Sequence, residues 1–164
     1  MNRAPAFAMR DSGQQHFVDT IPMTLATTLL GFDYGARRIG VAVGNALSGA
    51  RALEVVTNGT QGPDWARIGT LLREWRPAAL LVGLPLTMGG EEQRNSKAAR
   101  AFAAELTQRY ALAAHLVDER LSSQEAAQRF AARRASGQAR RKHAQTLDAV
   151  AAQIIIENWL AHEA

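Results

Sequence analysis

Residues 27–45 read TTLLGFDYGARRIGVAVGN, and the rest of the chain is best interpreted outward from this stretch. The apolar run from Thr27 to Asp33 is typical of a buried strand that ends in an acid. Gly35 supplies a turn, and Arg38 to Asn45 then predicts a second strand with small residues at alternate positions. A third short strand is predicted at Ala52 to Thr57, so the fold should open with a three-strand meander.

Helices and strands alternate after this meander. Asp64 to Trp75 has the apolar spacing of a helix, which Pro77 stops, and Ala78 to Leu84 is a continuous apolar strand. The remaining predicted elements are a helix at Asn95 to Tyr110, a strand at Ala114 to Asp118, a helix from Ser122 to about Arg133 and a final helix at His143 to His162. This order predicts an α/β fold, in which a mixed five-stranded sheet (the three-strand meander plus two βα units) carries helices on both faces.

The composition fits one folded domain. Of the 164 residues, 47% are hydrophobic and 21% are charged, so we expect residues 26–164 to form a single domain and residues 1–25 a flexible N-terminal extension. The absence of cysteine excludes disulfides and cysteine-based zinc sites. We find neither a bilayer-length apolar run nor a signal-peptide pattern, and we therefore expect no membrane association and a cytoplasmic location.

Positive charge is concentrated in one part of the chain. The net charge is +4, and the segment from Arg120 to His143 holds seven Lys or Arg residues but only one acid, Glu125. A basic segment on a nearly neutral body indicates an anionic partner such as nucleic acid. A solvated, arginine-rich loop without a partner is the alternative interpretation.

Three groups of acids occupy positions that could carry chemistry. Asp33 ends the first strand, Asp118 and Glu119 end the fifth, and Asp148 lies on or beside the apolar face of the last helix. Each has an ordinary alternative: a turn-forming Asp33, a surface salt bridge for Glu119, and for Asp148 a pair with a base such as Arg141. Together, convergent carboxylates predict a site for Mg²⁺ or Mn²⁺, with Asp33 bridging two ions that act on a phosphodiester.

Four segments resemble the YqgF/RuvX family, whose members are RNase H-like, related to Holliday junction resolvases and also described as pre-16S rRNA nucleases. The matching segments run in the family's order from Leu29 to Leu160: LGFDYGARRIGVAVGN (30–45), VGLPLTMGGEEQR (82–94), VDERLS (117–122) and DAVAAQIIIENWL (148–160). The resemblance implies an RNase H-like fold with Asp33, Glu119 and Asp148 as catalytic acids and metal ligands, and a less certain role for Asp118. It also implies a cofactor of Mg²⁺ or Mn²⁺, two ions, and a bacterial cytosolic setting.

The expected reaction is hydrolysis of nucleic-acid phosphodiester bonds. The preferred substrate is the end of a pre-16S rRNA, and the ribosome is therefore a possible partner. The residues expected to contact nucleic acid are all basic: Arg37, Arg38, Arg120, Arg133, Arg134, Arg140, Arg141 and Lys142. One alternative is a dimeric Holliday junction resolvase acting on branched DNA, and the oligomeric state, monomer or homodimer, stays open. Two others are a non-catalytic RNA-binding or ribosome-assembly protein and a sugar-kinase or actin-like ATPase, although such ATPases need two domains.

Overall fold

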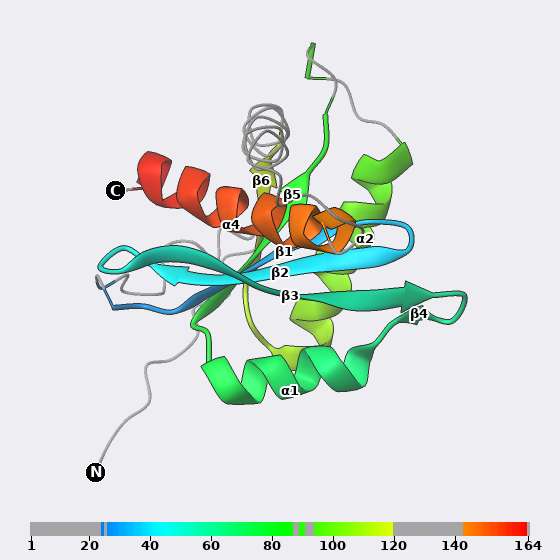
Figure 1. The fold of residues 1–164 in the computed structure, drawn as a ribbon, viewed down its shortest axis with the longest axis horizontal. Helices are drawn as coiled ribbons and strands as arrows, with labels where there is room; N and C mark the ends of the chain where they lie inside the picture. Colours follow the sequence, from blue (N-terminus) through cyan, green and yellow to red (C-terminus); the bar gives the residue numbers. More distant parts are fainter. Residues whose placement is uncertain (1–23, 25, 87–88, 91–93, 120–142, 164) are drawn as a thin grey trace, which may run out of the picture.

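The computed structural model describes residues 24, 26–86, 89–90, 94–119 and 143–163. They form one mixed sheet with helices on both faces, as Figure 1 shows. The expected N-terminal extension and the expected helix from Ser122 to about Arg133 lie outside these residues, so both stay predictions.

The sheet has the strand order β4-β3-β2-β1-β5-β6. Strands β1 (Leu29–Tyr34), β2 (Arg38–Asn45) and β3 (Gly49–Gly59) form the predicted antiparallel meander. Strands β5 (Ala79–Leu84) and β6 (Ala114–Asp118) continue the sheet in parallel beyond β1. A parallel strand beside β1 requires a crossover, which the chain between β3 and β5 supplies.

The predicted strand count was one too low, because β3 is longer than Ala52 to Thr57. It continues to Gly59, where a turn with Gly62 at a φ of 95° returns the chain as the two-residue strand β4 (Gly62–Pro63). Glycine tolerates this backbone conformation, which most residues avoid, so the turn can be tight. The five predicted strands and the alternation of helices and strands that follows the meander are otherwise confirmed.

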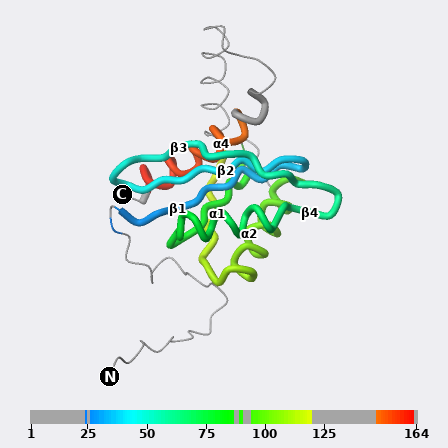
Figure 2. The backbone as a smooth tube through the Cα atoms, turned by 60° about the horizontal axis from the view of Figure 1, so that its bottom comes forward, coloured from blue at the N-terminus to red at the C-terminus, as the bar shows by residue number. Residues whose placement is uncertain are grey.

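Helices α1 (Trp65–Trp75) and α2 (Arg94–Tyr110) cover one face of the sheet, and α4 (His143–Glu163) covers the other, as Figures 1 and 2 show. The larger part of the core lies under α1 and α2, where Phe32 and Phe102 meet edge to face. A smaller apolar cluster lies under α4 and includes Leu81 and Ile155. None of the helices in the described part of the chain is long and apolar enough to cross a membrane.

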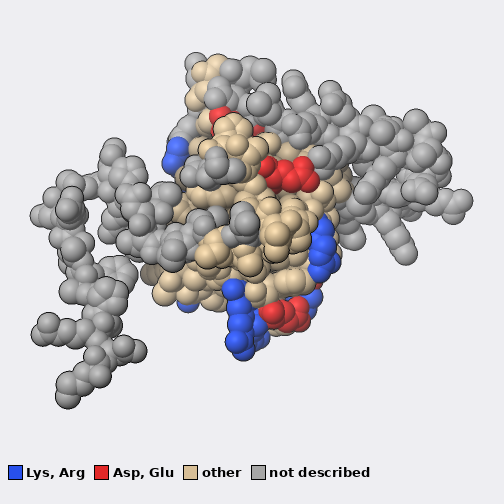
Figure 3. Space-filling model, turned by 90° about the vertical axis from the view of Figure 1, so that its left-hand side faces the viewer, with Lys and Arg blue, Asp and Glu red and all other residues tan. Residues whose placement is uncertain are grey.

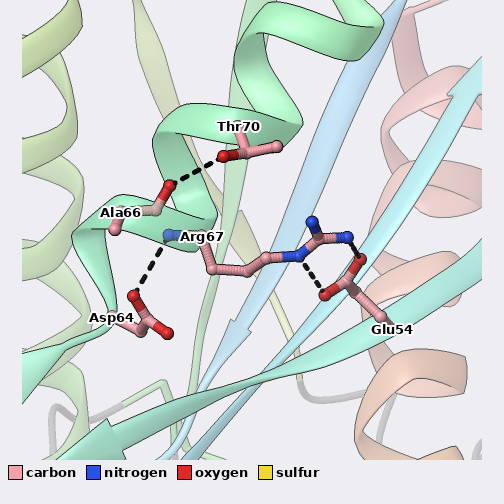
Figure 4. Close-up of polar contacts among 5 residues, drawn as sticks. All are labelled: Glu54, Asp64, Ala66, Arg67 and Thr70. Carbon is pink, nitrogen blue, oxygen red and sulfur yellow. Dashed lines mark hydrogen bonds and ion pairs between the residues drawn. The ribbon is translucent and has the colours of Figure 1, made fainter.

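Polar contacts fix the position of α1 against the sheet (Figure 4). Asp64 caps the helix by accepting a hydrogen bond from the backbone N–H of Arg67, which satisfies a donor that a helix start leaves unpaired. The Arg67 guanidinium donates two hydrogen bonds to the Glu54 carboxylate on β3, with Nε 2.7 Å from Oε2. This ion pair joins α1 to the strand above it on the face opposite α4.

Candidate active site

Asp33 lies near the end of β1, on the sheet face that α4 covers. It is paired in register with Gly40 of β2. On the other side of β1, Phe32 pairs with Val82 of β5, so the residue after Val82, Gly83, lies beside Asp33. The partly buried Asp33 carboxylate therefore has a glycine on each neighbouring strand, and these glycines leave room for other groups above the sheet.

Glu119 reaches Asp33 across one of these glycines. Its backbone N–H donates to the carbonyl oxygen of Leu84 at 3.1 Å, which extends the pairing of β6 with β5 by one residue. A Cβ atom on Gly83 would lie 2.0 Å from Oε1 of Glu119, so only glycine allows this side chain to lie there. Glu119 is 9% exposed, and its carboxyl group forms a hydrogen bond with that of Asp33.

Burial and mutual repulsion disfavour simultaneous ionisation of Asp33 and Glu119. Burial, followed by the charge of Asp33, raises the pKa of Glu119 to about 9. Burial also raises the pKa of Asp33, and the hydrogen bond from Glu119 opposes that shift. Two buried carboxyls in contact therefore share one proton when nothing neutralises their charge, as expected for like charges in a small space.

Asp148, in the first half of α4, is the third acid at this edge. Its backbone is packed directly on β2, because a Cβ atom on Gly40 would lie 1.9 Å from its carbonyl oxygen. Its Oδ2 lies 3.0 Å from Nε of Arg38 as an ion pair. That buried oxygen nevertheless receives no hydrogen bond of good geometry from the described residues. Burial raises the pKa of Asp148, while the positive charge of Arg38 lowers it.

The other expected site residues are placed less centrally. Asp118 is exposed and, by alternation along β6, belongs to the face opposite Glu119, although its charge contributes to the raised pKa of Glu119. Arg37 is exposed in the loop between β1 and β2, whereas Arg38 contacts Asp148 rather than pointing freely to solvent. The other basic residues expected to bind nucleic acid lie outside the described residues: Arg120, Arg133, Arg134, Arg140, Arg141 and Lys142.

Sequence reasoning missed basic side chains on α2. Arg94, Lys97 and Arg100 are exposed and recur every three residues, so they share one side of the helix. The hydroxyl of Ser96 donates to the carbonyl oxygen of Pro85, which attaches the first turn of α2 to the end of β5. The spacing of these three cations in the sequence could have revealed them.

On the side that Figure 3 shows, the described Lys and Arg side chains form small separate groups rather than one broad face.

The chemistry of the three acids fits a hard divalent cation. All the donors are carboxylate oxygens, which suit Mg²⁺ or Mn²⁺, and a cation there would favour the ionised forms that burial disfavours. Within the described ranges, however, no three His, Asp or Glu side chains are arranged closely enough to hold one ion. Asp33 and Glu119 are in contact, while Asp148 is paired with Arg38.

Comparison with known proteins identifies relatives over most of the chain. A family profile described as "RuvX: Holliday junction resolvase" matches residues 27–162. A protein of Xanthomonas campestris pv. campestris (strain 8004), named "Putative pre-16S rRNA nuclease", is 57% identical over 135 residues, which cover 82% of this chain and 87% of the relative. A protein of the same name from Xanthomonas axonopodis pv. citri (strain 306) is 55% identical with the same coverage.

Solved structures give more distant similarities. RuvC from Thermus thermophilus aligns with a TM-score of 0.49 at 20% identity, covering 84% of this chain and 97% of RuvC. The structure of T. thermophilus RuvC in complex with a Holliday junction substrate aligns with a TM-score of 0.48, also at 20% identity, covering 83% and 96%. The family assignment rests on the profile and on the curated relatives. The profile match over residues 27–162, together with these relatives, shows that the chain belongs to the RuvX family.

Proposed function

We propose that this chain is a divalent-metal-dependent nuclease that hydrolyses nucleic-acid phosphodiester bonds in the cytoplasm. The observation that carries the proposal is the gathering of Asp33, Glu119 and Asp148, from three different elements, at one edge of the sheet. Two carboxyls in contact and shielded from water are costly to the fold unless a shared proton or a cation offsets their charge. Such an arrangement is understandable where a cation offsets the cost and performs chemistry.

The three acids would hold Mg²⁺ or Mn²⁺, with Asp33 in the central position. When bound, such ions would polarise the phosphate and lower the pKa of water, which is the chemistry that phosphodiester hydrolysis needs. Asp33 contacts Glu119 and is influenced by the charge of Asp148, so it would be the ligand common to the two ions. Glu119 and Asp148 would each complete one side of the site.

The preferred substrate is the end of a 16S rRNA precursor, on or near the ribosome. The name shared by the Xanthomonas relatives supports this choice. The basic side chains on α2 and in the segment after Glu119 would contact phosphates, which position a strand without reading its bases. A four-way DNA junction is the second candidate, because the family description names a Holliday junction resolvase.

The test compares both substrates under identical conditions. Wild type, Asp33→Asn and Asp64→Asn are incubated with a precursor rRNA end and with a four-way junction, in Mg²⁺, in Mn²⁺ and in a chelator. Asp64 is the matched control, because it caps α1 away from the site and Asn is an equally good cap. We expect cleavage of the RNA by wild type and Asp64→Asn with either ion, and loss by orders of magnitude in folded Asp33→Asn.

Each alternative has its own signature in this experiment. Symmetric paired nicks in the junction by a stable dimer, without action on precursor RNA, would identify a resolvase. Tight RNA binding with no cleavage under any of the metal conditions would identify an RNA-binding assembly protein. Undiminished cleavage by Asp33→Asn, or in the chelator, would refute the metal site itself.

A further inference from the structure

The backbone that carries Arg38 is held firmly, whereas its side chain is not. The backbone N–H of Gly35 donates to the carbonyl oxygen of Arg38 at 2.9 Å and closes the loop between β1 and β2. Asn58, which is 6% exposed, holds the same loop through its backbone N–H to the carbonyl of Arg37 and its side-chain amide to the carbonyl of Gly35. The Arg38 side chain is 45% exposed, so it can exchange one partner for another without moving the loop.

Asp148 is held in the same way from its own side. Its carbonyl oxygen is seated on Gly40, two residues along β2 from Arg38, so its backbone position is fixed relative to Asp33. Its Oδ2 is buried, and Nε of Arg38 lies 3.0 Å from it. A contact without hydrogen-bond geometry neutralises charge but leaves the oxygen's lone pairs unused, which makes it a weaker hold than an aligned pair.

We propose that Arg38 is a built-in counter-cation of the metal site, which occupies Asp148 until a nucleic-acid phosphate draws the guanidinium away, so that nucleic acid and divalent ion bind cooperatively. This inference rests on the proposed function and adds to it an order of assembly. Arg38 and a divalent ion compete for one carboxylate oxygen. A phosphate bound by Arg38 therefore releases Asp148 to the ion.

The physical basis is linkage between two ligands. A guanidinium matches a phosphate with two parallel hydrogen bonds, whereas its Nε contact with Oδ2 of Asp148 lacks hydrogen-bond alignment. If the protein spends most of its time with Arg38 on Asp148, its apparent affinity for the ion equals the intrinsic affinity multiplied by the small fraction of time for which Arg38 is away. By reciprocity, the factor by which nucleic acid tightens ion binding equals the factor by which the ion tightens nucleic-acid binding.

The experiment measures Mn²⁺ affinity rather than cleavage. Isothermal titration gives the Mn²⁺ dissociation constant of wild type, Arg38→Gln, Arg38→Lys and Arg73→Gln, each with and without a short single-stranded RNA that gels show to stay intact. Arg73→Gln is the matched control, because it removes the same charge from an exposed position on α1, on the sheet face opposite α4. Asp33→Asn serves as the reference for loss of the site, and thermal melting confirms that each variant is folded.

Without RNA, we expect Arg38→Gln to bind Mn²⁺ about fivefold more tightly than wild type, at the lower end of measured couplings, and Arg73→Gln to change much less. RNA should tighten Mn²⁺ binding to wild type and to Arg73→Gln, and this gain should disappear in Arg38→Gln. Arg38→Lys, which keeps the charge but not the planar fork, should lie between wild type and Arg38→Gln.

Equal or weaker Mn²⁺ binding by Arg38→Gln would overturn the inference, since Arg38 would then orient Asp148 for the ion. Survival of the RNA effect in that variant would overturn it as well. Either result, in a wild type that binds Mn²⁺ and cleaves RNA, would refute only the counter-cation role of Arg38. If Asp33→Asn binds Mn²⁺ as well as wild type does, or if neither binds it, the inference and the proposed metal-dependent nuclease fail together.

Discussion

Replacing Glu119 with glutamine should make the stability of the metal-free protein less dependent on pH. Burial and the neighbouring Asp33 raise the pKa of Glu119 from 4.5 to about 9, so between these values the folded protein retains a proton that the unfolded chain releases. Because the folded state binds more protons, its stability falls as the pH rises through this window. Glutamine has the same shape as the protonated carboxyl and does not titrate.

The size of the effect follows from the raised pKa. One extra proton held by the folded state makes the free energy of unfolding fall by about 1.4 kcal/mol per pH unit. Between pH 6 and pH 8 the wild type should lose up to about 3 kcal/mol. In a domain of this size that corresponds to a fall in Tm of roughly 6–12 °C.

The assay is thermal unfolding in a chelator at several pH values, for wild type, Glu119→Gln and Glu105→Gln. Glu105 supplies the matched control, because the same chemical change there affects an exposed pair with Arg109 on α2. Wild type and Glu105→Gln should lose stability in parallel as the pH rises, while Glu119→Gln should lose less and melt higher at pH 8. An identical loss of stability in Glu119→Gln would refute the account of this carboxyl.

Three further changes test other parts of the structure. Gly83→Ala should displace the carboxylate of Glu119 and lower both Mn²⁺ affinity and cleavage, whereas Gly59→Ala, where a Cβ meets no atom within 4 Å, should change neither; equal effects would contradict the packing argument. Neutralising Arg94 and Lys97 together should weaken RNA binding and reduce the salt slope by about 0.7 log units per lost contact, measured by filter binding across a salt series. Deleting residues 1–23 should leave Tm and cleavage nearly unchanged, and a large fall in Tm would show that they pack on the domain.

Most of the architecture could be predicted because strong local patterns specify it. The continuous apolar run at Ala79–Leu84 and the final helix His143–Glu163 agree with their predicted positions to within two residues. The two ends of β3 were missed, because Gly49–Arg51 and Asn58–Gly59 include Gly and Asn, which are uncommon in strands. The structure places both ends in the sheet by pairing Gly49–Arg51 with Val43–Asn45 and Asn58–Gly59 with Gly62–Pro63.

The acids at the site could be proposed from the sequence, but their partners could not. Asp33, Glu119 and Asp148 stand out because strand ends and a covering helix meet at one edge of such a sheet. The sequence offered Arg141 as a partner for Asp148, since it precedes the helix that carries Asp148. The structure pairs Asp148 with Arg38, which is 110 positions earlier in the sequence and becomes a neighbour because α4 rests on β2, while Arg141 lies outside the described residues.

Glycines under α4 explain how the site can be both buried and charged. A Cβ on Gly31 would meet Ile156 and the carbonyl of Ala152, and one on Gly40 would meet the carbonyl of Asp148, so these two positions bring α4 down onto the sheet. Gly83 differs, because the space above it is shared by the Glu119 carboxylate and the side chain of Ile155 on α4. Glycine within a strand costs roughly 0.5–1 kcal/mol relative to alanine. Alanine at Gly83 would displace the Glu119 side chain from Asp33. The glycine therefore lowers the stability of the strand but permits the contact between the two acids on which the proposed chemistry depends.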